Sequence, residues 1–223
     1  MERKTQIKGI RKGLAGVLLG ALALANPAQA QEGWFNLQPA YNLKTESPTL
    51  RLEGGATLDK KFDVYGFLDL DSNKEGSADL DNYFGKLRFT YSLGDLSDKL
   101  ENVGIAAEYT TASGMEDIIR PQLTYKTSLF KDNSTTFRFS PCDINGEGGP
   151  ALNLFSYQQI NKDISVQLLA DYNLESQTAY IEPEIDYKIS EKASLFLQGR
   201  SFGELNQDLI TNMTPVIGIK IKF

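Results

Sequence analysis

Apolar and polar residues alternate with a period of two along most of this chain. Between Ala179 and Ile189 every odd-numbered residue is apolar, and four of the five residues between them are charged. Apolar residues again occupy each odd position from 217 to the C-terminal Phe223. Successive side chains of a β-strand point to opposite faces, whereas helical spacing cannot give this period. The pattern therefore predicts strands with one apolar face.

The same pattern divides the chain into twelve segments. They cover residues 34–43, 49–58, 62–71, 83–93, 102–111, 118–129, 134–141, 151–160, 163–174, 178–189, 193–202 and 213–223. Most of them have 8 to 12 residues, which is close to the roughly 9 to 11 residues of a tilted transmembrane β-strand. No stretch after residue 30 is long and apolar enough for a membrane helix, which needs roughly 20 residues.

The connections between these segments are of two alternating kinds. Five are mostly short and polar, at residues 59–61, 94–101, 131–133, 161–162 and 190–192. The other six tend to be longer or richer in Gly and acidic residues, at residues 44–48, 72–82, 112–117, 142–150, 175–177 and 203–212. Outer-membrane barrels have this asymmetry, with short periplasmic turns and longer outer loops. We therefore predict an all-β fold, a twelve-stranded antiparallel transmembrane β-barrel with both ends on the periplasmic side.

The more apolar face of each predicted strand contains no charged residue. A lipid-facing surface requires this, because Lys or Arg at the bilayer midplane costs roughly 2 to 4 kcal/mol. A soluble β-sandwich also alternates, but it needs neither a charge-free outer face nor a charged inner one. Segment 151–160 has no charged residue on either face, so its orientation stays open. Pro39, Pro121, Pro183 and Pro215 cannot donate to a ladder, and we interpret them as bulges or ladder ends.

Residues 1–30 have the three parts of an export signal. Five basic residues lie within 2–12, an apolar stretch covers 13–25, and Ala28-Gln29-Ala30 matches a cleavage site. We predict that this signal peptide is removed and that residues 31–223 form the barrel. Cleavage would remove five basic residues and Glu2, so 23 basic and 29 acidic residues become 18 and 28, a net charge of −10. So acidic a chain argues against nucleic acid as a partner.

The composition also restricts the chemistry. The chain contains no His and one cysteine, Cys142. Imidazole-dependent triads and His zinc sites are therefore impossible, and no internal disulfide can form. Glu182, Glu184 and Asp186 would stand about 7 Å apart on one strand face, a spacing compatible with paired-carboxylate hydrolysis. Alternating acids occur in any polar pore, however, and we predict no enzyme activity, no catalytic residue, no metal site and no cofactor.

The inward faces carry charged residues that are grouped by strand. The basic residues are Arg51, Lys86, Arg88, Arg120, Lys126, Arg138, Lys188, Arg200, Lys220 and Lys222. The acidic residues are Glu53, Asp63, Asp69, Asp71, Glu108, Asp171, Glu182, Glu184 and Asp186. In an open pore, facing walls of opposite sign would set up a transverse field. In a plugged lumen, the same residues would form salt bridges.

The aromatic residues of the strands also divide by face. Tyr65, Phe67, Phe84, Tyr180, Phe196 and Phe202 point inward, and Tyr41, Tyr91, Tyr109, Tyr125, Tyr172 and Tyr187 point outward. The outer group is typical of an interfacial girdle. The inner group either fills space or stacks a flat ring solute. Together the inward faces predict these pore-lining residues: Arg51, Glu53, Asp63, Tyr65, Phe67, Asp69, Lys86, Arg88, Glu108, Arg120, Arg138, Asp171, Glu182, Glu184, Asp186 and Arg200.

Two stretches, 58–70 and 86–100, resemble the nucleoside-specific channel-forming (Tsx-like) proteins of the outer membrane. In that family a KK…FDxYGxxD strand precedes a strand and turn of the type PRxSLxKL, although Lys86-Leu87-Arg88 lacks the Pro here. The resemblance implies a twelve-stranded barrel that passes nucleosides. It also implies that Tyr65, Phe67, Asp69 and Arg88 lie near the solute path.

The sequence therefore predicts a bacterial outer-membrane channel for passive diffusion of small hydrophilic solutes, nucleosides among the candidates. The alternatives are a non-conducting barrel whose surface loops bind a partner or polymer, and a soluble exported β-protein. Outer-membrane lipid would surround the barrel. The C-terminal strand ending in Phe223 resembles the segment that the outer-membrane assembly machinery recognises, so this machinery is a further expected partner.

Overall fold

The computed structural model describes residues 32–59, 61–72, 80, 82–94, 96–144, 149–204 and 213–223; the predicted signal peptide lies outside them. Within these ranges the strands are β1 (Glu32–Asn42), β2 (Ser47–Asp59), β3 (Phe62–Asp71), β4 (Asn82–Ser92), β5 (Val103–Ala112), β6 (Ile118–Thr127), β7 (Asn133–Ser140), β8 (Ala151–Gln159), β9 (Ile164–Asn173), β10 (Thr178–Ser190), β11 (Ala193–Glu204) and β12 (Thr214–Lys222). Each predicted segment lies within two residues of the corresponding strand.

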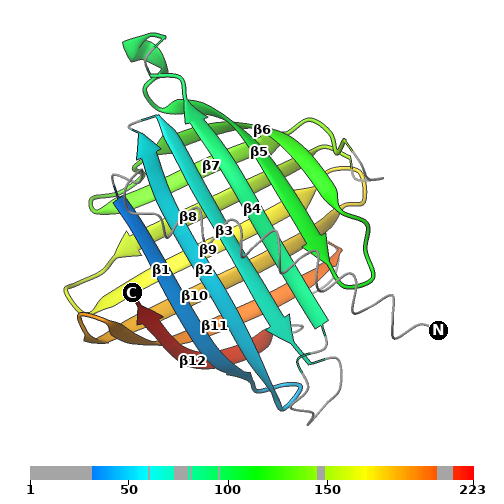
Figure 1. Ribbon diagram of the computed structural model, residues 1–223, viewed down its shortest axis with the longest axis vertical. Helices are drawn as coiled ribbons and strands as arrows, with labels where there is room; N and C mark the ends of the chain where they lie inside the picture. The colour runs from blue at the N-terminus through cyan, green and yellow to red at the C-terminus, as the bar shows by residue number, and fades with distance from the viewer. Residues whose placement is uncertain are drawn as a thin grey trace.

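The strands form one closed barrel. Hydrogen-bonded neighbours follow the chain order, and β1 closes the sheet by pairing with β12, so no strand edge is left free. The closing ladder runs from Asn36 opposite Lys222 to Asn42 opposite Val216. Figure 1 shows the tilted strands wrapped around a common axis. The predicted twelve-stranded antiparallel β-barrel is confirmed.

The connections define two ends of the barrel. At the turn end lie the connections after β2, β4, β6, β8 and β10, together with the start of β1 and the end of β12. The β4–β5 connection contains a 3-10 helix, η1 (Asp98–Leu100), and projects beyond the strands (Figure 1). The loop end carries the other six connections. Among the described residues, no helix has the length and apolar character needed to cross a membrane.

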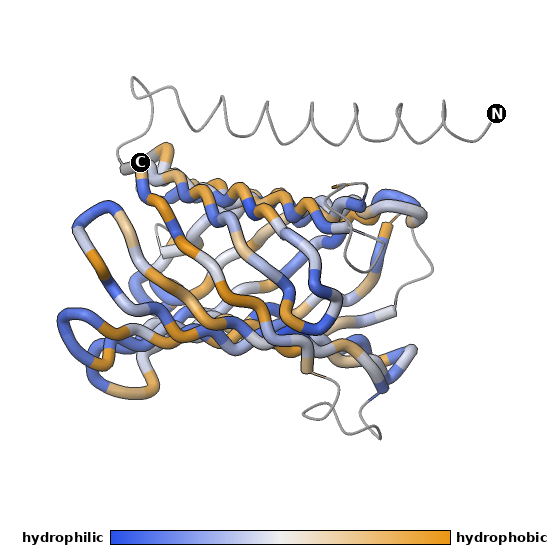
Figure 2. Tube along the Cα trace, turned by 90° about the horizontal axis from the view of Figure 1, so that it is seen from below, coloured by the Kyte–Doolittle hydropathy of each residue, from blue (hydrophilic) through white to orange (hydrophobic). Residues whose placement is uncertain are grey.

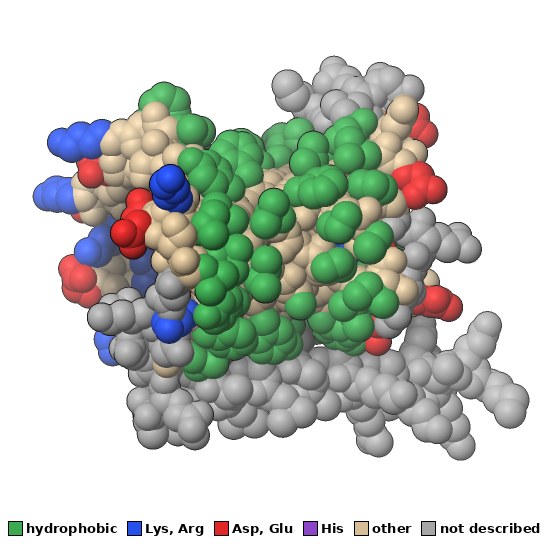
Figure 3. All heavy atoms as spheres, turned by 90° about the horizontal axis from the view of Figure 1, so that it is seen from above, with side chains coloured by type: hydrophobic (Ala, Val, Ile, Leu, Met, Phe, Trp, Pro, Cys, Tyr) green, Lys and Arg blue, Asp and Glu red, His purple; other side chains and the backbone are tan. Residues whose placement is uncertain are grey.

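Alternate residues of each strand point into and out of the barrel. In β12, Val216 and Lys220 are buried in the interior, whereas Ile217 and Ile219 are exposed outside. Figure 2 shows hydrophilic and hydrophobic positions alternating along the strands, and Figure 3 shows an apolar band between charged ends. Exposed apolar residues of this kind include Phe89, Ile105, Leu123, Phe137, Phe139, Leu152, Ile185, Leu195 and Leu197. An outer-membrane barrel needs such a band.

The orientation of β8, which the sequence left open, is now defined. Phe155 and Tyr157 face the interior cavity, and Leu152 is exposed outside. Ser156 also lies on the outer face, where its hydroxyl is 3.0 Å from Thr135 Oγ1 and accepts from Asn133 Nδ2 at 3.1 Å. These outward polar groups satisfy one another, so the outer surface stays free of unpaired polar atoms at this point.

Two strand prolines interrupt a ladder on one side of their strand. Pro39 pairs with β2, but the ladder to β12 skips from Leu37 to Ala40. Pro183 pairs with β9, but the ladder to β11 skips from Ile181 to Glu184. Proline has no N–H to donate, so in each case the gap faces the neighbour that would have needed that donor. The register is the same on both sides of each gap, so these two prolines mark gaps within a ladder and not the bulges or ladder ends that the sequence interpretation expected.

Candidate functional site

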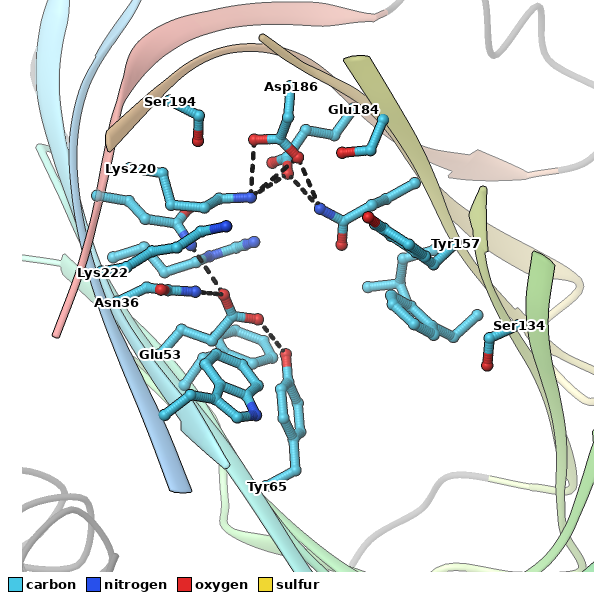
Figure 4. Close-up of a pocket in the computed structure, with 18 of the residues that line it drawn as sticks. Asn36, Glu53, Tyr65, Ser134, Tyr157, Glu184, Asp186, Ser194, Lys220 and Lys222 are labelled. Atoms are coloured by element: carbon cyan, nitrogen blue, oxygen red, sulfur yellow. Dashed lines mark hydrogen bonds and ion pairs between the residues drawn. The ribbon is translucent and has the colours of Figure 1, made fainter. Parts of the chain in front are cut away.

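The barrel encloses a cavity of about 780 Å³ on the side of the turn end. Its lining includes Lys126 and Lys222 near the turn end and reaches Arg51, Lys86 and Glu182 in the middle of their strands. Figure 4 shows side chains from facing walls pointing into this space. We call this cavity the vestibule.

One wall of the vestibule holds a hydrogen-bonded cluster from β9, β10, β11 and β12. Lys220 Nζ lies 2.7 Å from Glu184 Oε1 and 3.0 Å from Asp186 Oδ1. Gln167 Nε2 donates to both carboxylates at 2.9 Å, and Gln198 Nε2 donates to Glu184 Oε2 at 2.9 Å. Figure 4 draws this cluster around the two carboxylates. One ammonium group faces two carboxylates, so the cluster keeps an excess of negative charge.

The wall formed by β1, β2 and β3 carries a second carboxylate. Glu53 Oε2 accepts a hydrogen bond from Gln38 Nε2 at 2.8 Å, and Glu53 Oε1 accepts one from the Tyr65 hydroxyl at 2.7 Å. Both donors come from neighbouring strands of the same wall. Glu53 is therefore held by uncharged donors, and its charge is not cancelled by these contacts.

Aromatic rings form a continuous series along this wall, which we call the aromatic wall: Trp34, Tyr65, Phe67 and Phe84. Successive ring centroids are 6.3, 6.3 and 5.8 Å apart. The Arg51 guanidinium lies 4.8 Å from the centre of the Phe67 ring, and the Arg88 guanidinium lies 5.7 Å from that of Tyr65. Such cation–π contacts fix the guanidinium groups over the rings. The wall thus places flat apolar surfaces beside hydrogen-bonding groups.

Beyond the vestibule, toward the loop end, charged side chains meet in the lumen. Arg51 on β2 binds Asp69 on β3 (Nε to Oδ1, 2.6 Å) and Glu182 on β10 (Nη1 to Oε1, 2.9 Å). Arg200 on β11 lies 3.5 Å from Glu182 and 3.8 Å from Asp69. Because β2 and β10 are four strands apart around the barrel, the Arg51–Glu182 pair crosses part of the lumen.

A second group from β4, β5 and β9 lies beside the first. Lys86 Nζ lies 3.0 Å from Asp171 Oδ2 and 3.7 Å from Glu108 Oε1. Arg88 donates to Glu108 Oε2 from Nε at 3.0 Å and from Nη2. Since β4 and β9 are five strands apart, the Lys86–Asp171 pair spans nearly the full width of the barrel.

We call these two groups together the ion-pair layer: Arg51, Asp69, Lys86, Arg88, Glu108, Asp171, Glu182 and Arg200. None of their side chains is more than 21% exposed. Basic and acidic residues are equal in number among these eight, and Arg200 Nη1 also lies 3.8 Å from Asp71 Oδ2, so the charges of the layer are nearly balanced. This pairing favours the salt-bridge interpretation of the lumen charges over the transverse field.

The predicted pore-lining residues lie at two levels of the interior. Those that line the vestibule are Arg51, Glu53, Asp63, Tyr65, Phe67, Lys86, Arg88, Arg138, Glu182, Glu184 and Asp186. Four of these, Arg51, Lys86, Arg88 and Glu182, also belong to the ion-pair layer and mark the boundary between the two levels. The rest of the layer, Asp69, Glu108, Asp171 and Arg200, lies outside the vestibule lining. Arg120 binds Asp143, a residue of the connection between β7 and β8. The structure therefore brings the vestibule residues together and separates Arg120 from them.

The sequence prediction included Tyr65 and Phe67 but missed several other uncharged residues of the vestibule, because it ranked charged side chains first. Ser134, Thr136 and Tyr157 line the wall formed by β7 and β8, and Trp34 lines the opposite side. The alternation contained the signal for two of them, because Ser134 and Thr136 share a strand face with Arg138. The orientation of Tyr157 had no such signal, because no charged residue marks either face of its strand.

This chain is similar to known proteins in structure but not in sequence. No protein-family model matches the chain, and no curated protein matches it in sequence. Among solved structures, the chain is similar to the KdgM porin at a TM-score of 0.57 and 12% identity, covering 85% of this chain and 99% of that one. It is similar to the NanC porin at a TM-score of 0.55 and 11% identity, covering 85% and 98%.

An enzyme shares the same architecture. The outer membrane phospholipase A from Escherichia coli matches at a TM-score of 0.52 and 12% identity, covering 88% of this chain and 93% of that one. At such low identity these similarities define the fold, which is that of porin-like outer-membrane barrels. They do not extend to the nucleoside-specific family that the sequence resembles, and they do not by themselves separate a channel from an enzyme.

Proposed function

We propose that this chain is a bacterial outer-membrane channel, exported by its signal peptide, through which small hydrophilic solutes diffuse passively. The observation that carries the proposal is the vestibule, a polar cavity of about 780 Å³ inside a closed barrel with an apolar outer band. The porin-like fold supports the same function. The enzymatic alternative has less support, since the chain contains no His.

The vestibule ends at the ion-pair layer, which in this proposal limits the size and polarity of the solutes that pass. Arg51 and Arg200 share the same two partners, Asp69 and Glu182. A cation that has alternative carboxylates can release one while it keeps the other, so a polar solute can replace one ion pair at a time. Solutes with several hydrogen-bonding groups are favoured, because they replace the contacts that they break.

Nucleosides are the first solutes to test. The aromatic wall provides ring faces on which a flat base can stack. Such stacking accepts any of the bases, because every base has a flat π-face. Glu53 lies in hydrogen-bond contact with Tyr65 of that wall, at 2.7 Å, and is placed to accept from a ribose hydroxyl. The resemblance of residues 58–70 and 86–100 to the nucleoside-specific channels points to the same solute class. The KdgM porin has been solved with disordered oligogalacturonate, so acidic sugars form the natural comparison set.

Planar-bilayer recording tests the proposal. Residues 31–223 would be refolded into a bilayer, and the current would be recorded before and after addition of adenosine, thymidine or galacturonate. We expect discrete conductance steps that a nucleoside blocks reversibly, and weaker block in a Tyr65→Ala variant. A folded and inserted protein without current would overturn the channel; current without any nucleoside block would remove nucleosides from the proposal.

One observation favours a second function, a non-conducting barrel whose surface loops bind a partner or polymer. The ion-pair layer closes much of the lumen with buried pairs, as in a plugged barrel. Under this alternative, loss of part of the loop 141–150 would abolish partner binding, and no variant of the layer would pass current. The bilayer recording above separates the two functions.

The outer surface supports two further partners. The apolar band is suited to lipid. Phe223 is 73% exposed on the outer face, its N–H donates to Phe35 O at 2.9 Å, and the two rings lie 6.0 Å apart. This exposed terminal ring is available to the outer-membrane assembly machinery, and Phe223→Ala is expected to reduce insertion in cells while refolding in detergent proceeds.

A further inference from the structure

The β6–β7 ladder ends early on the loop side. These strands pair only from Leu123 opposite Phe139 to Thr127 opposite Thr135. The other edge of β6 pairs with β5 from residue 118 to 125, and β7 pairs with β8 along its whole length. Continued in the same register, the ladder would place Pro121 opposite Pro141. Neither residue has an N–H to donate, so the pairing stops before them.

The open part of this junction is held by few contacts, and we call it the β6–β7 seam: residues 119–122 of β6 and 140–144 after β7. Ile144 N donates to Ile119 O at 2.8 Å. Arg120 binds Asp143 through two hydrogen bonds, Nε to Oδ1 at 2.6 Å and Nη2 to Oδ2 at 3.2 Å. The Asp143 side chain is fully buried in this contact. A side-chain ion pair thus stands where the rest of the wall has a backbone ladder.

The inner side of the seam carries polar atoms without partners. Gln122 Oε1 and Ser140 Oγ within the seam, and Arg138 Nη1 and Thr110 Oγ1 on the strands beside it, are buried and make no hydrogen bond within the described part of the chain. They belong to three neighbouring strands, β5, β6 and β7, and in the continued register Gln122 would face Ser140. Buried groups of this kind are rare, and a cluster of them indicates that a ligand, ion or water completes the site in another state.

The outer side of the seam is apolar. Leu123 and Phe139, the last pair of the ladder, are 53% and 40% exposed, and Leu152 beside Phe139 is 47% exposed. The seam therefore has a polar inner side with an unpartnered guanidinium atom and an apolar outer side that faces lipid. An amphiphile that crosses the barrel wall here would place its polar head on the inner side and its apolar chain on the outer side.

We propose that the β6–β7 seam is a lateral port and binding site for an anionic amphiphile. The anionic head accepts hydrogen bonds from Arg138 and Ser140 and lies beside Gln122, and the chain passes through the wall beyond the end of the ladder and then lies along the outward side chains of Leu123 and Phe139. The Arg120–Asp143 pair closes the port when it is empty. This port goes beyond the passage of hydrophilic solutes through the lumen and does not depend on it, since a barrel that passes no current would still bind the amphiphile.

Photo-crosslinking tests the port. The full barrel, residues 31–223, would be placed in lipid nanodiscs with dodecanoate carrying a diazirine in the part of its chain nearest the carboxylate, and the adducts would be mapped by mass spectrometry. The matched control probe is the corresponding uncharged alcohol. We expect dodecanoate adducts to concentrate in residues 119–123 and 137–144. Arg138→Gln is expected to lower their yield about tenfold, as for loss of a charge-assisted hydrogen bond.

Two variants separate the port from ordinary lipid contact. Pro121→Ala with Pro141→Ala restores both N–H groups and is expected to close the seam and remove the adducts. Asp143→Asn removes the closing ion pair and is expected to increase them. Adducts spread evenly over the outward residues of all strands, with acid and alcohol alike, would overturn the proposal. So would unchanged yields in both the Arg138 variant and the proline variant, each checked for folding by its resistance to unfolding in detergent.

Discussion

The vestibule and the ion-pair layer are built from the same strands, yet their charges lie in different environments. At the vestibule mouth, Lys126 and Asp63 form an ion pair at 3.1 Å with side chains 56% and 40% exposed. In the layer, Arg51 and Asp69 pair at 2.6 Å with side chains 11% and 7% exposed. Exposed pairs contribute little because water competes for both charges. Buried pairs hold the lumen together because the loss of one partner leaves an unpaired charge without water.

Under the proposed channel function, this difference predicts which level of the lumen would select solutes. Charges at the vestibule mouth, such as Lys126 and Asp63, remain available to ions and solutes, whereas charges in the layer are already paired with one another. The vestibule is therefore expected to attract and orient solutes, and the layer is expected to limit their passage.

Removal of one buried partner is expected to have the largest effect. Arg51→Met leaves Asp69 and Glu182 with Arg200 as their remaining cation and is expected to cost about 3 to 5 kcal/mol of unfolding free energy. The matched control, Lys126→Met at the mouth, is expected to cost about 0 to 1 kcal/mol. Urea unfolding in lipid vesicles measures both. Equal losses for the two variants would contradict this difference between the vestibule and the layer.

Chemical labelling compares the water accessibility of two positions on one face of β7, one in the vestibule and one nearer the loop end. Ser134 lines the vestibule and is exposed, whereas Ser140 is completely buried nearer the loop end. In a Cys142→Ser background, Ser134→Cys is expected to react with a water-soluble methanethiosulfonate about a hundredfold faster than Ser140→Cys, because thiol reactivity follows exposure. Stopped-flow labelling of the refolded barrel gives both rates. Similar rates would show that water reaches both levels equally.

A vestibule charge is expected to alter ion selectivity in a salt-dependent way. Lys222 lines the vestibule, whereas the exposed turn residue Lys131 does not line it. Lys222→Gln removes a positive charge and is expected to shift the reversal potential in the direction of greater cation selectivity in about 0.1 M salt. In about 1 M salt, where the screening length falls to roughly 3 Å, this shift is expected to disappear. Lys131→Gln serves as the control and is expected to leave the reversal potential unchanged at both salt concentrations. A shift that persists at high salt would place Lys222 in the narrow part of the path.

Repair of a ladder gap is expected to have the smallest effect. Pro183 faces the interrupted part of the β10–β11 ladder. Pro183→Ala supplies one N–H and is expected to change the unfolding free energy by about 1 kcal/mol or less, the net value of one hydrogen bond. The same unfolding measurement applies, with Pro215→Ala as the comparison. A loss of several kcal/mol would show that the gap is required for the register of the barrel.

The sequence predicts the strands and their faces because alternation is a local property. In a strand such as 179–189, the charged residues Glu182, Glu184 and Asp186 identify the inner face, because the lipid-facing outer band must be free of charge. The closure of β1 on β12 follows from the even count of strands and the need to leave no edge. Where no charge marked a face, as in β8, alternation could not decide the orientation.

The depth and partners of the lumen charges could not be predicted from the sequence. The partner of Lys86 is Asp171, which lies 85 positions away and five strands around the barrel. The contact depends on strand tilt, barrel width and side-chain reach, which no local pattern encodes. The β6–β7 seam could not be predicted for the same reason, since only the register between the two strands shows that Pro121 and Pro141 would lie opposite each other.

Single-channel conductance of a matched pair of proteins tests the central claim most directly. Lys86→Ser with Asp171→Ser removes both ends of the pair that spans the lumen, so no charge is left without its partner. We predict small discrete steps for the unmodified barrel and steps larger by about twofold or more for the double variant, because the constriction that limits conduction is widened. Equal steps from the two proteins, or silence from both in folded and inserted form, would contradict the account.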